Sequence, residues 1–269
     1  MPMFEVLPGV SLHYVDEGEG DRPPLVLIPG WTFTTQVFVH QIERFSANRR
    51  VIAIDPRSHG LSTVTTTGNN YVTQGTDLRA LIEHLSIEKP VLLGWSFGCL
   101  TAWEYVETHG PESVSGIVTV DLSPTPMTET PNTWSEGSIG ELAEGYQLLG
   151  TVAGQIDFVT GSAKEVMLQK DVSPETLEWL INQSLATPPW AAAAYFAAGM
   201  FSNYAETVQR IDGRIPALCF VAEHWSEVAK QTLAAITPAA EIEVKGGHMM
   251  FWEYADEFND RLAQFLTKA

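Results

Sequence analysis

The sequence predicts an α/β fold built on a mostly parallel sheet, with a helical segment inserted late in the chain. Three observations predict it. Short runs of valine, isoleucine and leucine recur along the chain, and such runs are typical of strands covered on both faces. Segments with helical periodicity separate the runs. A chain of 269 residues, 45% of them hydrophobic, is long enough to bury a large core without metal or disulfides.

The first half of the chain alternates between the two kinds of element. We expect strands at 10–17, 24–28, 51–55, 90–95 and 114–121. We expect helices at 35–47, 70–86 and 97–109. Strands separated by helices in this way pair in parallel, because each helix carries the chain back to the same end of the sheet.

The pattern changes at Pro124. From there to about Arg214 the chain is polar, interrupted by prolines and helical, with no convincing strand. Alternation then resumes with a strand at 216–222, a helix at 226–237, a strand at 241–244 and a helix at 254–267. We therefore expect an α/β core made of residues 1–123 and 213–269, and a helical cap made of residues 124–212.

The charge of the chain argues against two classes of partner. Asp and Glu number 33 against 15 Lys and Arg, for a net charge of −18. Such a surface repels phosphate backbones and anionic lipids, so we expect no nucleic acid and no membrane partner. The amino terminus lacks the pattern of a signal peptide, and no apolar run approaches the ~20 residues of a membrane span. We expect a soluble cytoplasmic protein, monomeric or homodimeric.

The segment Gly94-Trp95-Ser96-Phe97-Gly98 follows an expected strand and opens an expected helix. This is the context of a nucleophile elbow. The two glycines permit the tight turn, because side chains there would collide with the neighbouring strand and helix. Ser96 would then lie at the exposed tip of the turn, at the positive end of a helix. We interpret Ser96 as a nucleophile, the alternative being a serine that only caps the helix.

A serine hydroxyl needs a base, and His248 is the best candidate among the seven histidines. It lies between glycines and methionines, on a loop after the last expected strand. The pKa of imidazole lies near neutral pH, as a base requires. His59 lies on a loop that we expect to be remote from Ser96, so we assign it a structural role.

Two acids are candidates for orienting His248. In most chains of this design the acid follows the next-to-last strand, where this sequence reads Ala222-Glu223-His224-Trp225. The other position is the end of the preceding core strand, where Asp121 follows Val120. Asp121 would project from the same sheet edge as Ser96. We favour Asp121 and keep Glu223 as the alternative.

Acyl transfer also needs hydrogen-bond donors for the developing oxyanion. The segment Ile28-Pro29-Gly30-Trp31 ends the first long central strand, and Gly30 allows a sharp turn. We expect the backbone N–H of Trp31 to point into the site beside the N–H of Phe97. These two amides form the predicted oxyanion hole.

Large apolar side chains neighbour the candidate catalytic positions in the sequence, which indicates an apolar pocket for a small, largely hydrophobic substrate. We expect the pocket to be lined by Trp95, Met249 and Phe251 and, from the cap, by Trp190. The sequence has no Walker motif, no GxGxxG after the first strand and no HExxH. We therefore expect no metal, nucleotide or flavin cofactor.

Taken together, these residues resemble the α/β-hydrolase fold superfamily along nearly the whole chain. The matching segments are LVLIPGW, VIAIDPRSHGLS, LGWSFG and GGHMMF, and Ser96, Asp121 and His248 follow the family's order of nucleophile, acid and histidine. The resemblance implies a mostly parallel eight-stranded sheet, a helical cap after strand six and esterase-like chemistry. LIPGW and the glycines before His248 also resemble the cofactor-free dioxygenases that cleave 3-hydroxy-4-quinolones.

Three functions are open at this point. The first is a serine hydrolase that cleaves a hydrophobic ester or lactone through an acyl-enzyme. The second is a cofactor-free dioxygenase, in which His248 and Asp121 deprotonate a 3-hydroxy-4-quinolone and Ser96 only positions it. The third is a small-molecule receptor that uses the covered pocket for binding alone. We favour the hydrolase, because a complete set of nucleophile, base, acid and oxyanion donors argues against a receptor.

Overall fold

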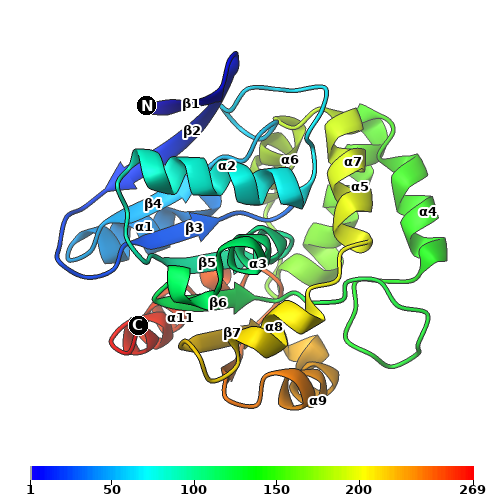
Figure 1. The fold of residues 1–269 in the computed structure, drawn as a ribbon. Helices are drawn as coiled ribbons and strands as arrows, with labels where there is room; N and C mark the ends of the chain where they lie inside the picture. The colour runs from blue at the N-terminus through cyan, green and yellow to red at the C-terminus, as the bar shows by residue number, and fades with distance from the viewer. Residues whose placement is uncertain (1) are drawn as a thin grey trace.

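A single eight-stranded sheet forms the centre of the molecule (Figure 1), in a computed structural model that describes residues 2–269. The strand order is β1-β2-β4-β3-β5-β6-β7-β8. The strands are β1 (Met3–Leu7), β2 (Val10–Glu17), β3 (Leu25–Ile28), β4 (Val51–Ile54), β5 (Val91–Trp95), β6 (Gly116–Val120), β7 (Ala217–Val221) and β8 (Glu241–Val244). β2 is antiparallel to both of its neighbours, and every other pair is parallel. The predicted mostly parallel α/β sheet is confirmed.

The central strands are apolar because helices cover both faces of the sheet. Every residue of β3, β4, β5 and β6 is buried. On one face α2 packs against α3, and on the other α1 packs against α11 (Figure 1). These helices are α1 (Val39–Ser46), α2 (Tyr71–His84), α3 (Gly98–His109) and α11 (Ala255–Phe265). Short turns η1 (Thr35–Phe38), η2 (Pro111–Ser113) and η4 (Glu223–Trp225) and helices α9 (Ser226–Ile236) and α10 (Met250–Glu253) complete the layers.

Between β6 and β7 the chain leaves the sheet and forms a group of helices, green to yellow on the right of Figure 1. They are α4 (Ile139–Leu148), α5 (Val152–Ser162), the π-helical turn η3 (Ala163–Met167), α6 (Pro174–Leu185), α7 (Pro189–Met200) and α8 (Ala205–Ile211). Side-chain caps begin several of them, such as the capping box of Ser138 and Glu141 on α4. We refer to residues 124–212 as the cap segment.

One strand has no counterpart in the pattern of the sequence. β1 lies at the edge of the sheet and pairs only with β2, and none of its residues is fully buried. An edge strand of this kind needs no continuous apolar run, so the signal that identified the central strands is missing. Among residues 2–269, no helix is long and apolar enough to cross a membrane.

Candidate active site

Ser96 lies in a sharp turn between β5 and α3, with a left-handed backbone (φ 51°). The flanking glycines are required by contact as well as by shape. A Cβ on Gly94 would lie 2.6 Å from the nitrogen of Cys99, and one on Gly98 would lie 2.4 Å from the carbonyl oxygen of Ile28. The turn therefore depends on both glycines, and it exposes the serine at the carboxyl end of the central strands.

Asp121 and His248 are joined by a short hydrogen bond, although 127 positions separate them. His248 Nδ1 lies 2.7 Å from Asp121 Oδ2, and the other oxygen, Oδ1, accepts a hydrogen bond from the Ala222 N–H at 2.8 Å. Asp121 follows β6 and is 1% exposed. Because a carboxylate only accepts, Nδ1 of His248 carries the proton, and Nε2 is left for proton exchange.

The charge around His248 favours the protonated imidazole. Burial lowers the pKa of His248, but the hydrogen bond and the charge of Asp121, together with the charge of Glu136, outweigh it. The pKa of His248 is therefore raised above its ordinary value. A base stabilised in this way holds a proton well once it has accepted one.

Glu223, the alternative acid, is occupied elsewhere. Its Oε1 accepts a hydrogen bond from the Gly246 N–H at 3.2 Å, and its Oε2 accepts one from Gln169 Nε2 at 2.9 Å. Its side chain is exposed and makes no hydrogen bond with His248 in residues 2–269. Of the two candidate acids, the structure brings only Asp121 to the imidazole.

The two amides expected to form the oxyanion hole flank Ser96. A Cβ on Gly30 would lie 3.0 Å from the Cβ of Ser96, so the chain entering Trp31 passes directly beside the serine. Neither the N–H of Trp31 nor that of Phe97 has a hydrogen-bond acceptor within the described part of the chain. Two free donors beside a serine are what a developing oxyanion requires.

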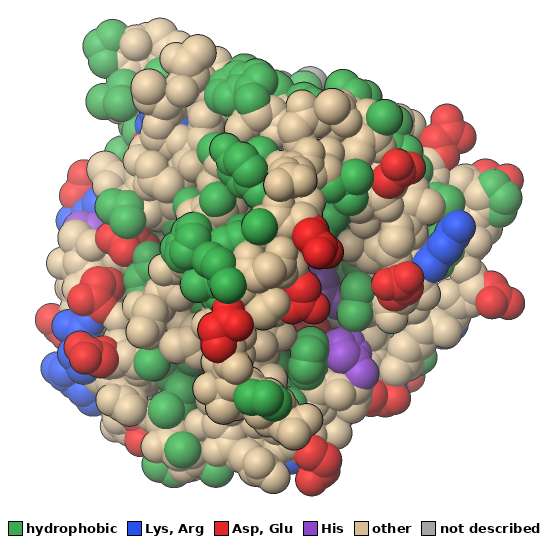
Figure 2. Space-filling view, turned by 90° about the vertical axis from the view of Figure 1, so that its right-hand side faces the viewer, with side chains coloured by type: hydrophobic (Ala, Val, Ile, Leu, Met, Phe, Trp, Pro, Cys, Tyr) green, Lys and Arg blue, Asp and Glu red, His purple; other side chains and the backbone are tan. Residues whose placement is uncertain are grey.

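Ser96 and His248 face the same cavity, which measures about 300 Å³. Its wall combines aromatic and aliphatic side chains with a few polar ones: Trp31, Phe33, Trp95, Ser96, Phe97, Glu136, Glu141, Phe158, Ser162, Val166, Met167, Phe196, Met200, His224, Trp225 and His248. Figure 2 shows this side of the molecule, with acidic and hydrophobic side chains around a hollow where histidine is visible. No hydrogen bond joins Ser96 to His248 within residues 2–269.

Three of the four predicted pocket residues lie elsewhere, which corrects that expectation. Met249 and Phe251 are fully buried in the core, and Trp190 is 46% exposed at the start of α7. Of the four predicted residues, Trp95 alone lines the cavity. Its Nε1 donates a hydrogen bond to the carbonyl oxygen of His248 at 2.8 Å. Nearness in sequence to a catalytic position was a poor guide, because successive residues on a loop or helix point in different directions.

Half of the residues that line the cavity come from the cap segment. Phe196 and Met200 lie one turn apart on α7 and so share a face, while Phe158 comes from α5. The i, i+4 spacing was visible in the sequence, but it is equally typical of side chains that pack within the cap. Nothing in the sequence singled out Glu136, which lies in the loop before α4.

The π-helical turn η3 holds the loop that carries His248. The carbonyl oxygens of Val166 and Met167 accept hydrogen bonds from the N–H groups of His248 and Met249, at 2.9 and 2.8 Å. A Cβ on Gly247 would lie 2.8 Å from the Met167 oxygen, so only glycine permits this approach. The cap segment therefore takes part in positioning the candidate base.

His59 contacts the segment that follows Trp31. Its Nε2 accepts a hydrogen bond from the N–H of Thr32 at 3.1 Å, and its Nδ1–H donates to the Arg57 carbonyl oxygen at 3.0 Å. Thr32 directly follows Trp31 and has a left-handed backbone (φ 62°). His59 does not line the cavity, and its role is structural, as expected: it holds the segment that carries the Trp31 amide.

Burial of His59 makes the stability of the protein sensitive to acid. Burial lowers the pKa of His59 from 6.5 to about 4. The unfolded chain binds the proton more readily, so the stabilisation is complete above pH 6.5 and is lost as the pH falls toward 4. We expect a loss of roughly 3 kcal/mol over that window. Denaturant unfolding at a series of pH values would measure it.

The neutral variant His59→Gln is the matched control for that measurement, because glutamine accepts from Thr32 without titrating. Its free energy of unfolding should fall less steeply between pH 6.5 and 4 than that of the parent protein. Equal slopes in the two proteins would mean that His59 is not the responsible group.

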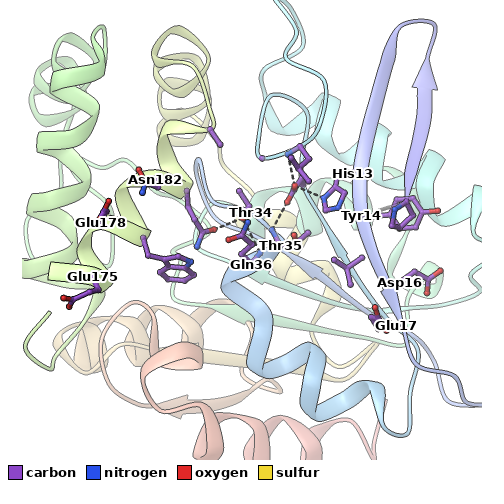
Figure 3. Close-up of a pocket in the computed structure, with 18 residues that line it drawn as sticks. His13, Tyr14, Asp16, Glu17, Thr34, Thr35, Gln36, Glu175, Glu178 and Asn182 are labelled. Atoms are coloured by element: carbon purple, nitrogen blue, oxygen red, sulfur yellow. Dashed lines mark hydrogen bonds and ion pairs between the residues drawn. The ribbon is translucent and has the colours of Figure 1, made fainter. Parts of the chain in front are cut away.

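A larger groove of about 870 Å³ lies between α6 and β2 and does not include the candidate catalytic residues. Figure 3 shows Glu175, Glu178 and Asn182 on one side of it and His13 on the other. His13 Nδ1 and Asp55 Oδ2 are 2.8 Å apart and both residues are buried. Asp55 also accepts from the N–H groups of Thr35 and Leu61, which marks the pair as part of a structural network.

Comparison with known proteins identifies the fold of the chain. A model of the alpha/beta hydrolase fold family matches residues 23–142. Two solved structures superpose on nearly the whole chain: a bromoperoxidase from Bacillus anthracis (TM-score 0.85, 22% identity, 96% of each chain) and an esterase from Exiguobacterium antarcticum (TM-score 0.84, 21% identity, 98% of each chain). At this identity the likeness establishes the fold.

Sequence relatives match the chain over different lengths. The chain is 32% identical over 115 residues to epoxide hydrolase 1 of Caenorhabditis elegans, which is 42% of this chain but only 28% of that protein. It is 33% identical over 115 residues to 3-oxoadipate enol-lactonase 2 of Acinetobacter baylyi, or 42% of each protein. It is 23% identical over 265 residues to the AB hydrolase superfamily protein YisY of Bacillus subtilis, or 95% of each.

The chain therefore has the α/β-hydrolase fold, as its motifs predicted, and residues 23–142 match the model of that fold family. Its relatives and structural neighbours are enzymes of this fold, among them an esterase, an enol-lactonase and an epoxide hydrolase. These findings support a hydrolase.

Proposed function

We propose that this protein hydrolyses a small hydrophobic ester or lactone through a covalent acyl-enzyme on Ser96. One observation carries the proposal. Asp121, buried and acceptor-only, holds Nδ1 of His248 at 2.7 Å, while the same imidazole and Ser96 line one cavity. An acid, an imidazole and a serine in this arrangement match the roles of a catalytic triad.

In the first half of the reaction His248 Nε2 removes the proton of the Ser96 hydroxyl as its oxygen attacks the substrate carbonyl. The carboxylate of Asp121 stabilises the imidazolium that forms. The proton then passes from His248 to the leaving alkoxide, and the acyl group stays on Ser96. Hydrogen bonds between nucleophile and base are often long without substrate and tighten in the complex.

The negative charge that develops on the carbonyl oxygen needs donors. The N–H groups of Trp31 and Phe97 have no acceptor within residues 2–269 and are the two donors that we assign to this oxygen. In the second half of the reaction His248 activates a water, which attacks the acyl-enzyme and releases Ser96. All of these steps use the side chains and backbone of this chain.

The cavity supports an apolar substrate. Aromatic rings from the core and from the cap segment make up much of its wall, and no lysine or arginine of residues 2–269 is among the lining residues. A substrate that relies on a carboxylate or phosphate would find no basic partner there. An ester or lactone with an apolar body fits both the wall and the activities for which the esterase and lactonase relatives are named.

Covalent labelling tests the nucleophile directly. A fluorophosphonate should label the protein once, at Ser96, because only a serine activated by His248 attacks phosphorus readily. Peptide mass spectrometry locates the adduct. His248→Ala should label at least about 10²–10³ times more slowly, since the base is gone.

Labelling on another residue, or esterase turnover in a protein that resists the probe, would contradict the proposal. The dioxygenase alternative gives a different result, because its chemistry consumes oxygen and releases carbon monoxide from a 3-hydroxy-4-quinolone. An oxygen electrode distinguishes the two activities in the same preparation.

A further inference from the structure

The polar side chains that face the candidate active-site cavity include two carboxylates. Besides Ser96 and His248, the lining contains Glu136, Glu141, Ser162 and His224. Within the described chain no basic side chain other than histidine lines the cavity. Apart from the two histidines, the ionisable side chains available to a bound molecule are both carboxylates.

The two glutamates differ in how they are held. Glu141 Oε2 accepts hydrogen bonds from the backbone N–H and from the hydroxyl of Ser138, both at 2.8 Å, and closes the capping box of α4. The carboxylate of Glu136 accepts no hydrogen bond from any residue between 2 and 269. Its backbone is fixed, since its N–H donates to the Pro126 carbonyl oxygen. Glu136 thus presents a free acceptor to the cavity from a fixed position.

Aromatic rings line the same space. Trp31 contacts Phe158 and Phe196 with ring centroids 5.2 and 6.0 Å apart, and Trp95 and Trp225 add to the wall. The face of an aromatic ring attracts a cation, and tryptophan does so most strongly. A carboxylate without a partner, set among aromatic rings, is suited to an ammonium group.

We propose that Glu136 determines specificity by binding a cationic nitrogen, so that the preferred substrate is a hydrophobic ester carrying an ammonium group. This rests on the hydrolase proposed above and names its substrate class. The apolar body of the substrate packs on the aromatic wall, while its cation lies against Glu136 and its carbonyl lies at Ser96.

The electrostatic surroundings of Glu136 agree with this role. Glu136 is an exposed residue, so the desolvation of its carboxylate by the surrounding protein is only partial. This desolvation, with a smaller contribution from Asp121, raises the pKa of Glu136 to about 7, although His248 acts in the opposite direction. A cation bound beside this carboxylate favours its ionised form. Binding of an ammonium group and ionisation of Glu136 favour each other.

A pair of isosteric substrates tests the proposal. We would use two p-nitrophenyl esters whose acyl chains end in a trimethylammonium group or in the neutral tert-butyl group of the same shape. The native enzyme should prefer the ammonium ester in kcat/KM by about tenfold. In Glu136→Gln the ratio should fall by at least about threefold, because only the aromatic wall then attracts the cation, while the neutral ester is still hydrolysed. Glu144→Gln, an exposed change on α4 outside the cavity, should keep the native ratio.

Taking the ratio at one pH cancels any change that Glu136→Gln causes in the pKa of His248, because both esters use the same base. No preference in the native enzyme, or an equal preference in native enzyme and Glu136→Gln, would overturn the proposal. If neither ester is hydrolysed, the proposed hydrolase fails, but calorimetric binding of the intact esters to Ser96→Ala still tests Glu136. Preferential binding that depends on Glu136 supports the proposal, and equal binding overturns it.

Discussion

Replacing Ser96 with alanine is expected to lower kcat by about 10⁶-fold on any ester that the native enzyme cleaves. The hydroxyl is the only atom that would become bonded to the acyl group, and the His248–Asp121 pair has no other oxygen to activate except water. Substrate affinity should change little, because the cavity wall stays intact. Pre-steady-state assays with a p-nitrophenyl ester, in which the initial burst disappears, measure the effect.

Ser226→Ala is a suitable control for that experiment, since Ser226 begins α9 and does not line the cavity. Its turnover should match that of the native protein. Ester turnover that survives in Ser96→Ala would contradict the acyl-enzyme. Oxygen uptake with a 3-hydroxy-4-quinolone that survives in Ser96→Ala but is lost in His248→Ala would instead support the dioxygenase.

Replacing Asp121 with asparagine is expected to lower kcat by about 10⁴-fold. The new side-chain amide would lack the charge that stabilises the imidazolium, and it would favour the wrong tautomer of His248. The pH profile should change as well. Asp121 raises the pKa of His248, so its loss should move the acidic limb of the profile to lower pH. Steady-state rates measured across the acidic and neutral range check both effects.

Glu223→Gln provides the comparison, because Glu223 was the alternative acid. The exposed Glu223 carboxylate bonds to Gly246 and Gln169 and does not reach His248, so its loss should change kcat by less than about threefold. A larger loss in Glu223→Gln than in Asp121→Asn would reverse the assignment.

The fold was predictable because its signals are local. The runs that became β3, β4 and β6 are apolar throughout, as strands covered on both faces must be. The turn at Ser96 was predictable for a similar reason, since two glycines between a strand and a helix leave few conformations. β1 escaped notice because an edge strand that stays partly exposed carries no such run.

The candidate site was predictable only for residues that lie at the ends of core strands or shortly after them. Ser96, Asp121 and His248 each end or follow a core strand, so the direction of the sheet predicts that they converge. Glu136 and His59 lie on loops whose paths depend on packing against distant parts of the chain. No periodicity or motif encodes the contact of His59 with Thr32, or the direction in which Glu136 points. The prediction of the residues that line the cavity was wrong for the same reason.

The two bonds from η3 to the loop of His248 have a consequence for how the enzyme would work. They connect the backbone of the loop that carries His248 to a part of the cap segment. If η3 moved to admit a large substrate, its hydrogen bonds to the backbone of the His248 loop would have to break first. A displacement of η3 would therefore change the position of His248 as well as the shape of the cavity.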